Sequence, residues 1–79
     1  MWVYRCKLCG REFFDIVELF AHVELEHAGD KRVAELIREW KWVWAAGYRI
    51  SRMERFRDLH ARGLAERRWV RAGAQGRFL

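Results

Sequence analysis

The sequence predicts a small α+β protein in which two short strands and a helix are followed by two more helices and a short C-terminal β-hairpin. Three features lead to this prediction. Two Cys and two His lie close together in the first 27 residues, two later stretches repeat apolar residues with the period of a helix, and two strand-like stretches flank a Gly-rich turn near the C-terminus. A chain of 79 residues buries little apolar area, so it usually needs a metal ion or disulfides for stability.

Four residues in the first part of the chain have the spacing of a tetrahedral metal site. Cys6 and Cys9 are separated by two residues, so they flank a tight turn and direct both thiolates toward one ion. His22 and His27 lie about one turn apart on a predicted helix and supply two imidazole nitrogens. Because all four ligands are protein groups, no coordination position stays open for water. The pattern therefore predicts one structural zinc ion.

Aromatic and apolar residues around these ligands complete the pattern Tyr-x-Cys-x2-Cys-x3-Phe-x5-Leu-x2-His-x4-His over residues 4–27. This pattern resembles the two-cysteine, two-histidine zinc-finger family, which implies a ββα fold with Phe13 and Leu19 as its small core. The helix positions that contact bases in that family correspond here to Asp15, Val17, Glu18 and Ala21. Two acids, a Val and an Ala are poor neighbours for phosphate, so we expect a finger that docks within the protein rather than one that reads DNA.

A second apolar stripe on the finger helix also favours docking. Ile16, Phe20 and Val23 recur at helical spacing in addition to Phe13 and Leu19. The small core of one finger cannot cover both sets of side chains. The sequence therefore predicts that another element of the chain packs against the finger helix.

A second helix is predicted over residues 31–46. Asp30 is a suitable N-cap, and Gly47 ends the helix or turns the chain. Six apolar residues form one stripe along it: Val33, Leu36, Ile37, Trp40, Val43 and Trp44. Trp42 lies on the opposite side, so we expect this helix to pack between two partners.

A third helix and a hairpin complete the chain. Ser51 and Glu54 fit a capping box, which predicts a helix over residues 52–62 that stops at a glycine. Residues 67–71 are typical of a short strand, and residues 77–79 are expected to return as its partner after a turn that contains two Gly.

This order of elements over residues 33–79 resembles the helix-turn-helix core and wing of winged-helix DNA-binding proteins. With Gly47 as the turn glycine, the buried positions of that family correspond to Trp42, Ala46, Tyr48, Met53 and Phe56. Val43 occupies a place where the family prefers a small residue. The finger helix takes the place of the family's preceding helix, so the zinc finger of residues 1–29 and the winged part of residues 30–79 are expected to pack as one unit. The combination looks like small archaeal or archaeal-virus regulators.

The positive charge of the chain is concentrated in its second half. Residues 1–47 carry seven basic and eight acidic groups, whereas residues 48–79 carry nine Arg and three acidic groups. Such a surface attracts a polyanion, and Arg can pair with guanine or phosphate through two hydrogen bonds. The winged-helix resemblance implies that DNA is contacted by Arg49, Ser51, Arg52, Arg55, Arg67, Arg68 and Arg71.

Two hypotheses about function follow. The first is a zinc-containing regulator of transcription that binds double-stranded DNA. The alternative is a zinc-stabilised adaptor that binds a protein partner, or a second copy of itself, through the Trp-rich helix and the apolar finger face. Glu54 and Asp58 favour the alternative, because they lie on the exposed side of the third helix, where they repel phosphate or pair with neighbouring Arg. The salt dependence of binding separates the two hypotheses.

Other classes of protein are disfavoured. No apolar run approaches the length of a membrane span, and no signal peptide is visible, so we expect reduced thiols in the cytoplasm, near nucleoid or host-cell DNA. No open metal position, activated nucleophile or phosphate-binding loop is present, which predicts no enzyme activity and no small-molecule substrate. The chain lacks Asn, Thr and Pro and is rich in Arg and Glu, as in proteins of hyperthermophiles.

Overall fold

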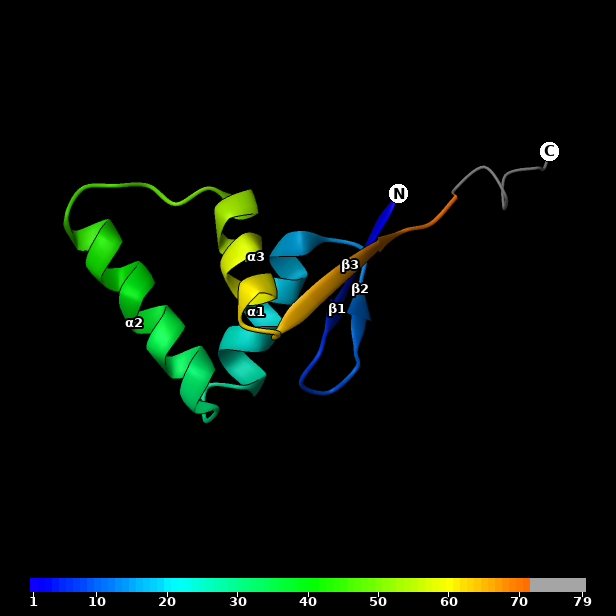
Figure 1. Ribbon diagram of the computed structural model, residues 1–79, viewed down its shortest axis with the longest axis horizontal. Coiled ribbons are helices and arrows are strands. Elements are labelled where there is room, and N and C mark those ends of the chain that lie inside the picture. The colour runs from blue at the N-terminus through cyan, green and yellow to red at the C-terminus, as the bar shows by residue number, and fades with distance from the viewer. Residues whose placement is uncertain (72–79) are drawn as a thin grey trace.

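A computed structural model describes residues 1–71 of the chain and confirms a small α+β protein (Figure 1). Three helices and a three-stranded antiparallel sheet make up the described part. In chain order the elements are β1 (Trp2–Cys6), β2 (Glu12–Phe13), α1 (Ile16–Glu26), α2 (Lys31–Ala45), α3 (Arg52–Ala61) and β3 (Ala65–Trp69). The three predicted helices are all present.

The sheet joins the two ends of the described chain. Its strand order is β2-β1-β3, so β1 lies in the centre. β1 pairs with β2 at only two positions, but it pairs with β3 along its whole length, from Trp2 opposite Trp69 to Cys6 opposite Ala65. Outside the strands, the Val70 N–H donates to the Met1 carbonyl at 2.8 Å. The longer ladder of β1 is therefore made with the C-terminal strand.

This pairing corrects the predicted wing. The strand expected at residues 67–71 spans Ala65–Trp69 and extends the sheet of the finger. The physical reason is that β1 has a free edge opposite β2, and β3 fills it with five residue pairs. The return strand expected at residues 77–79 lies outside the described residues.

Helix α1 presents two apolar stripes, as the sequence predicted. The Asp15 carboxylate accepts a hydrogen bond from the Val17 N–H at 2.8 Å and begins the helix. Leu19 is fully buried, and Phe20 and Val23 are buried in the same core as residues of α2 and α3. The second stripe is thus covered by the other helices.

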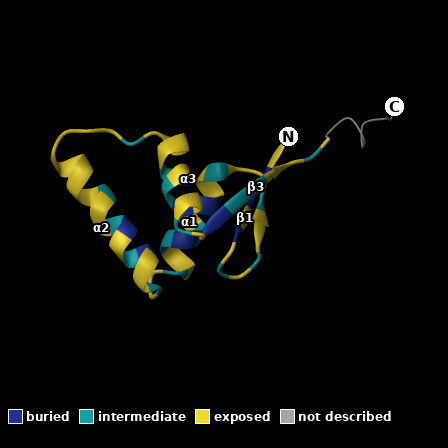
Figure 2. Ribbon diagram, viewed as in Figure 1, coloured by how far each residue is buried: buried dark blue, intermediate teal, exposed yellow. Residues whose placement is uncertain are grey.

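The core lies between the sheet and the three helices (Figure 2). Its largest fully buried side chains are Leu residues from α1, α2, α3 and the position just before β3: Leu19, Leu36, Leu59 and Leu64. Tyr4 of β1 and Phe56 of α3 meet edge to face, with ring centroids 5.6 Å apart. One continuous core therefore connects the finger to the helices that follow it.

Residues 31–40 of α2 border this core. Val33 and Leu36 are buried and Trp40 packs against them, whereas the C-terminal end of the helix projects away from the rest of the protein (Figures 1 and 2). Trp42 and Trp44 are 73% and 71% exposed. The sequence therefore predicted the apolar stripe of α2 correctly, but not that its C-terminal end has no partner among the described residues.

The expected winged-helix burial is wrong at four of its five positions. Phe56 is buried, but Trp42, Ala46, Tyr48 and Met53 are exposed. The reason is the connection between α2 and α3. Gly47 ends α2 with a φ of 94°, and residues 48–51 then follow without regular structure before α3 begins. α3 packs on α1 and β3 instead of on the end of α2.

Replacing Ser51 is expected to weaken α3. The Ser51 hydroxyl accepts from the Glu54 N–H at 3.1 Å, and the Glu54 carboxylate accepts from the Ser51 N–H at 3.2 Å, which is the predicted capping box. We expect Ser51→Ala to lower the free energy of unfolding by about 1 kcal/mol, and Ser51→Asp to retain most of it. Urea denaturation of the zinc-loaded protein measures both. Equal stability of Ser51→Ala and the unmodified protein would show that the cap has no energetic role.

Candidate metal centre

The cysteine side of the candidate metal centre is formed by the β1–β2 turn. Cys6 is the last residue of β1, and Cys9 follows in the turn. The Gly10 N–H donates to the Cys6 carbonyl at 2.7 Å, and the Cys6 N–H donates to the Arg11 carbonyl at 2.8 Å. Gly10 has a φ of 84°, which suits glycine. These backbone contacts fold the chain tightly enough to bring both sulfur atoms to one side of the turn.

The histidine side comes from α1 and its C-terminus. His22 is within the helix, and His27 is the C-cap, with a φ of −120°. His22 and His27 are five positions apart. In an ideal helix this spacing places two side chains about 140° apart around the helix axis, so they would point away from each other. Because the helix ends at Glu26 and the backbone turns at His27, the second imidazole comes back beside the first, with ring centroids 4.9 Å apart.

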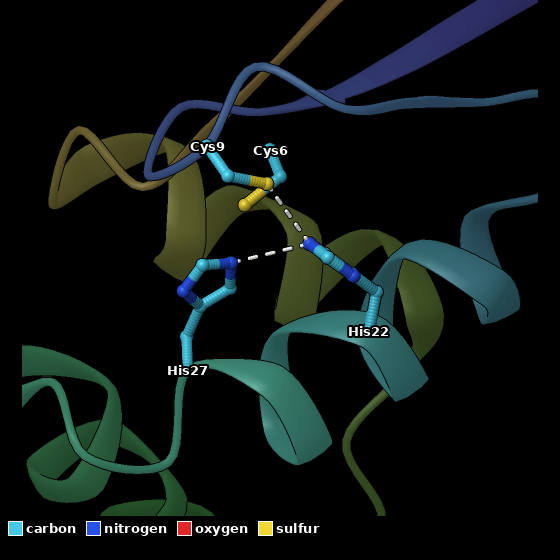
Figure 3. Close-up of side chains that lie close together, drawn as sticks. All are labelled: Cys6, Cys9, His22 and His27. Atoms are coloured by element: carbon cyan, nitrogen blue, oxygen red, sulfur yellow. Dashed lines mark hydrogen bonds between the residues drawn. The ribbon is translucent and has the colours of Figure 1, made fainter.

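The four predicted ligands converge on one point (Figure 3). Their ligand atoms all lie within 4.8 Å of one another, and the Nε2 of His22 is 3.2 Å from both the Cys9 Sγ and the His27 Nε2. A zinc tetrahedron with N and S ligands has edges of about 3.3 Å between nitrogens and about 3.5 Å between nitrogen and sulfur. Cys6, Cys9, His22 and His27 can therefore bind one metal ion.

The surroundings of Cys6 and His22 favour the neutral forms of these two ligands. Burial raises the pKa of the Cys6 thiol, which has no exposed surface. Burial, followed by the neighbouring His27, lowers the pKa of His22, so this imidazole is free of its proton at neutral pH. A metal ion that binds here therefore finds His22 without a proton, but it must displace the proton of Cys6.

Metal affinity is therefore expected to fall as the pH falls. Between pH 7 and pH 6 the affinity should decrease about tenfold for each proton that the ion displaces, and the buried Cys6 thiol supplies at least one. Competition with a chromophoric chelator at several pH values measures this slope. An affinity that does not change with pH would show that the thiol of Cys6 is not a ligand.

The C-terminal part of the chain covers Cys6. Ala65 lies opposite Cys6 in the β1–β3 ladder, and the Lys7 N–H donates to the Leu64 carbonyl at 2.9 Å. Leu64 and Ala65 are both buried. The sequence patterns do not predict this contact, because residues 64 and 65 lie between the predicted third helix and the predicted strand at residues 67–71. In the sequence, the only indication of this contact is the pair of apolar residues directly after Gly63.

The predicted DNA-contacting residues of the linker and α3 lie in different environments. Arg49, Ser51 and Arg52 are exposed before and at the start of α3. Arg55 is half-buried on the side of α3 that faces α2, with its guanidinium carbon 5.6 Å from the centre of the Trp40 ring. Its Nε has no hydrogen-bond partner among the described residues. Three of the four predicted contacts are therefore exposed near the start of α3, whereas Arg55 faces α2.

The predicted residues of the wing lie on opposite faces of the sheet. Arg67 lies above the Trp2 ring, 3.9 Å from its centre, on the face that carries the helices. Arg68 points to the other face, where it donates to both carboxylate oxygens of Glu12 at 3.1 and 3.2 Å. Arg71 is exposed beyond the end of the strand. Because neighbouring strand residues alternate between faces, these three Arg do not form one surface.

One exposed cation near this region was not among the predicted contacts. Arg57 lies on α3, exposed, beside a groove that also contains Arg67. The signal in the sequence is the spacing of Met53, Arg57 and His60, which places the three side chains on one stripe of the helix.

Comparison of the chain with protein-family models, curated proteins and solved structures finds no match. The two family resemblances therefore depend on the residues and the geometry described above. What the structure shows is a Cys2His2-type cluster in a small α+β fold. Among residues 1–71, the helices are too short or too polar to cross a lipid bilayer.

Proposed function

We propose that this chain is a zinc-containing DNA-binding protein, and that it regulates transcription. Zinc is the proposed ion because two thiolates and two imidazoles in a closed tetrahedral set are the ligands of structural zinc sites. Such an ion stabilises the fold and does not take part in a reaction. The proposed DNA contacts come from the second half of the chain.

The observation that carries the DNA-binding proposal is the distribution of unpaired charge in residues 48–71. Of the three acids there, Glu66 pairs with Arg5. Glu54 accepts from the Ser51 N–H and Asp58 from the Trp40 Nε1, which orients these two carboxylates but leaves them charged. Within residues 1–71, six Arg of this segment form no ion pair. Arg55 and Arg67 lie over aromatic rings, and the other four are exposed: Arg49, Arg52, Arg57 and Arg71. These free guanidinium groups favour contact with phosphates.

The finger itself supports this surface instead of reading bases. The four positions that contact bases in zinc fingers are exposed here, but they include Asp15 and Glu18 and no basic residue. The Asp15 carboxylate is also occupied as the N-cap of α1. We therefore assign the finger to the stability of the fold and the arginines at the start of α3 to the phosphates.

The test is the affinity for a DNA duplex as a function of salt. We expect binding at low salt, with log K falling against log salt by about 0.9 per phosphate contact, so a slope of about −3 to −4 for four Arg. Gel shift and fluorescence anisotropy with the zinc-loaded protein provide the measurement, and selection from random duplexes then gives any preferred sequence. If no duplex binds even at low salt, the proposal is wrong.

A second candidate function is favoured by the exposed aromatic residues of α2. Trp42, Trp44 and Tyr48 are largely exposed, and aromatic side chains are enriched in protein interfaces. An adaptor that binds a protein through this end of α2 would bind with weak salt dependence. It would lose affinity in Trp42→Ala and Trp44→Ala, whereas neutral replacements of Arg49 and Arg52 would have little effect.

A further inference from the structure

A groove opens between α3 and the sheet. Its volume is about 420 Å³, and it is lined by Trp2, Met53, Phe56, Arg57, His60 and Arg67. This volume lies in the range of about 300–1,000 Å³ that is typical of small-ligand sites. The groove is separate from the metal ligands and takes residues from β1, α3 and β3.

The walls of this groove are flat and aromatic. Trp2 is 37% exposed, and it is held by Arg67, whose guanidinium carbon lies 3.9 Å from the centre of the indole, and by the edge of Trp69. On the α3 side, the rings of Phe56 and His60 are 6.1 Å apart and inclined by only 30°. Side chains that are fixed in this way offer a rigid surface on which a planar ring can stack.

The charge of the groove is positive. Among residues 1–71, Arg57 and Arg67 line it and no carboxylate does. The two acids of α3, Glu54 and Asp58, line a different groove on the side of α2, which Arg57 also borders. Guanidinium groups only donate hydrogen bonds, so the groove is complementary to a ligand that combines a flat ring with acceptors such as phosphate oxygens.

We propose that this groove holds one unpaired nucleotide of DNA, with its base stacked beside Trp2 and its phosphate at Arg57. The inference rests on the proposed DNA-binding function and makes it more specific. The duplex is bound through the free Arg residues, of which Arg57 contacts the phosphate at the junction, and the adjoining single-stranded nucleotide enters the groove. Stacking on aromatic side chains tolerates any base, so little sequence preference is expected at this position.

The experiment compares two DNA probes that differ only in their bases. Both are hairpin duplexes with a labelled overhang of four nucleotides: the overhang of one carries thymines, and that of the other carries abasic sites with the same phosphates. Fluorescence anisotropy with the full zinc-loaded chain gives both affinities. We expect the thymine probe to bind about tenfold more tightly, because stacking of one base contributes a factor of this size.

The possible results separate this inference from the DNA-binding proposal. Equal binding of both probes would overturn the nucleotide site and leave the duplex-binding function intact. Absence of binding to either probe would overturn both. Displacement of the thymine probe by micromolar thymidine monophosphate would assign the groove to a free nucleotide and overturn the assignment to DNA.

Variants locate the effect in the groove. We expect Trp2→Ala to remove the tenfold preference for the thymine probe and to leave the affinity for the abasic probe unchanged. His60→Ala tests the opposite wall with an exposed residue whose loss leaves the core intact, and we expect it to reduce the preference severalfold. The matched control is Trp42→Ala on the exposed end of α2, which should retain the full preference. A preference that persists in both Trp2→Ala and His60→Ala would contradict the proposal.

Discussion

The variant Cys6→Ser is expected to be largely unfolded at neutral pH, even with zinc present. Cys6 is a metal ligand, the last residue of the central strand, and a fully buried part of the core. Structural zinc in finger peptides contributes about 10–16 kcal/mol at pH 7, which is as large as the whole stability of a typical domain, about 5–15 kcal/mol. Far-ultraviolet circular dichroism and the dispersion of amide NMR signals measure the loss of structure.

The matched control for this variant is Lys7→Ser. Lys7 is the exposed neighbour of Cys6, and its backbone contact with Leu64 does not need its side chain. We expect this control to fold and bind zinc like the unmodified protein. If Cys6→Ser retained the helices and the dispersed spectrum, the metal centre would have no structural role in the chain.

The triple variant Arg49→Gln, Arg52→Gln and Arg57→Gln is expected to lose most of the affinity for duplex DNA. Arg49 lies just before α3, and Arg52 and Arg57 lie on it. All three side chains are exposed and form no ion pair within the described part of the chain. Each phosphate contact contributes about 0.9 to the salt slope. The triple variant should therefore lower the slope by about three and reduce the affinity at 0.1 M salt on the order of a hundredfold.

Arg68→Gln is the control that separates this surface from the one predicted by sequence. The Arg68 side chain pairs with Glu12 on the outer face of the sheet, so its loss should leave the salt slope nearly unchanged. If Arg68→Gln weakened DNA binding as strongly as the triple variant, the outer face of the sheet would be the DNA-binding surface.

The parts of the site that depend on neighbouring residues in the sequence were predictable. The spacing of the four metal ligands, the caps at Asp30 and Ser51, and the second stripe of α1 all appear in the structure as expected. Each cap, each pair of metal ligands and the helical stripe has a spacing of only a few residues, although the two ligand pairs lie 13 or more positions apart. Such local patterns carry their own geometric requirements.

The parts that depend on distant contacts were not predictable. β3 pairs with β1 across most of the chain, and nothing in the pattern of Ala65–Trp69 indicates which edge it joins. The exposure of Trp42 and Trp44 follows from the path of residues 48–51, which has no sequence signature. The division of Arg67 and Arg68 between two faces was foreseeable, because it follows from the alternation of a strand.

The metal centre and β3 are expected to fold as one unit. Hydrogen exchange of single amides, measured with and without zinc, tests whether they do. In the zinc-loaded protein, the Lys7 N–H bonded to Leu64 and the Val70 N–H bonded to Met1 should be protected, and so should the β1–β3 ladder between them. After zinc is removed with a chelator, these amides should exchange at the rates of an unfolded chain. Protection of β3 that survives the removal of zinc would contradict the claim.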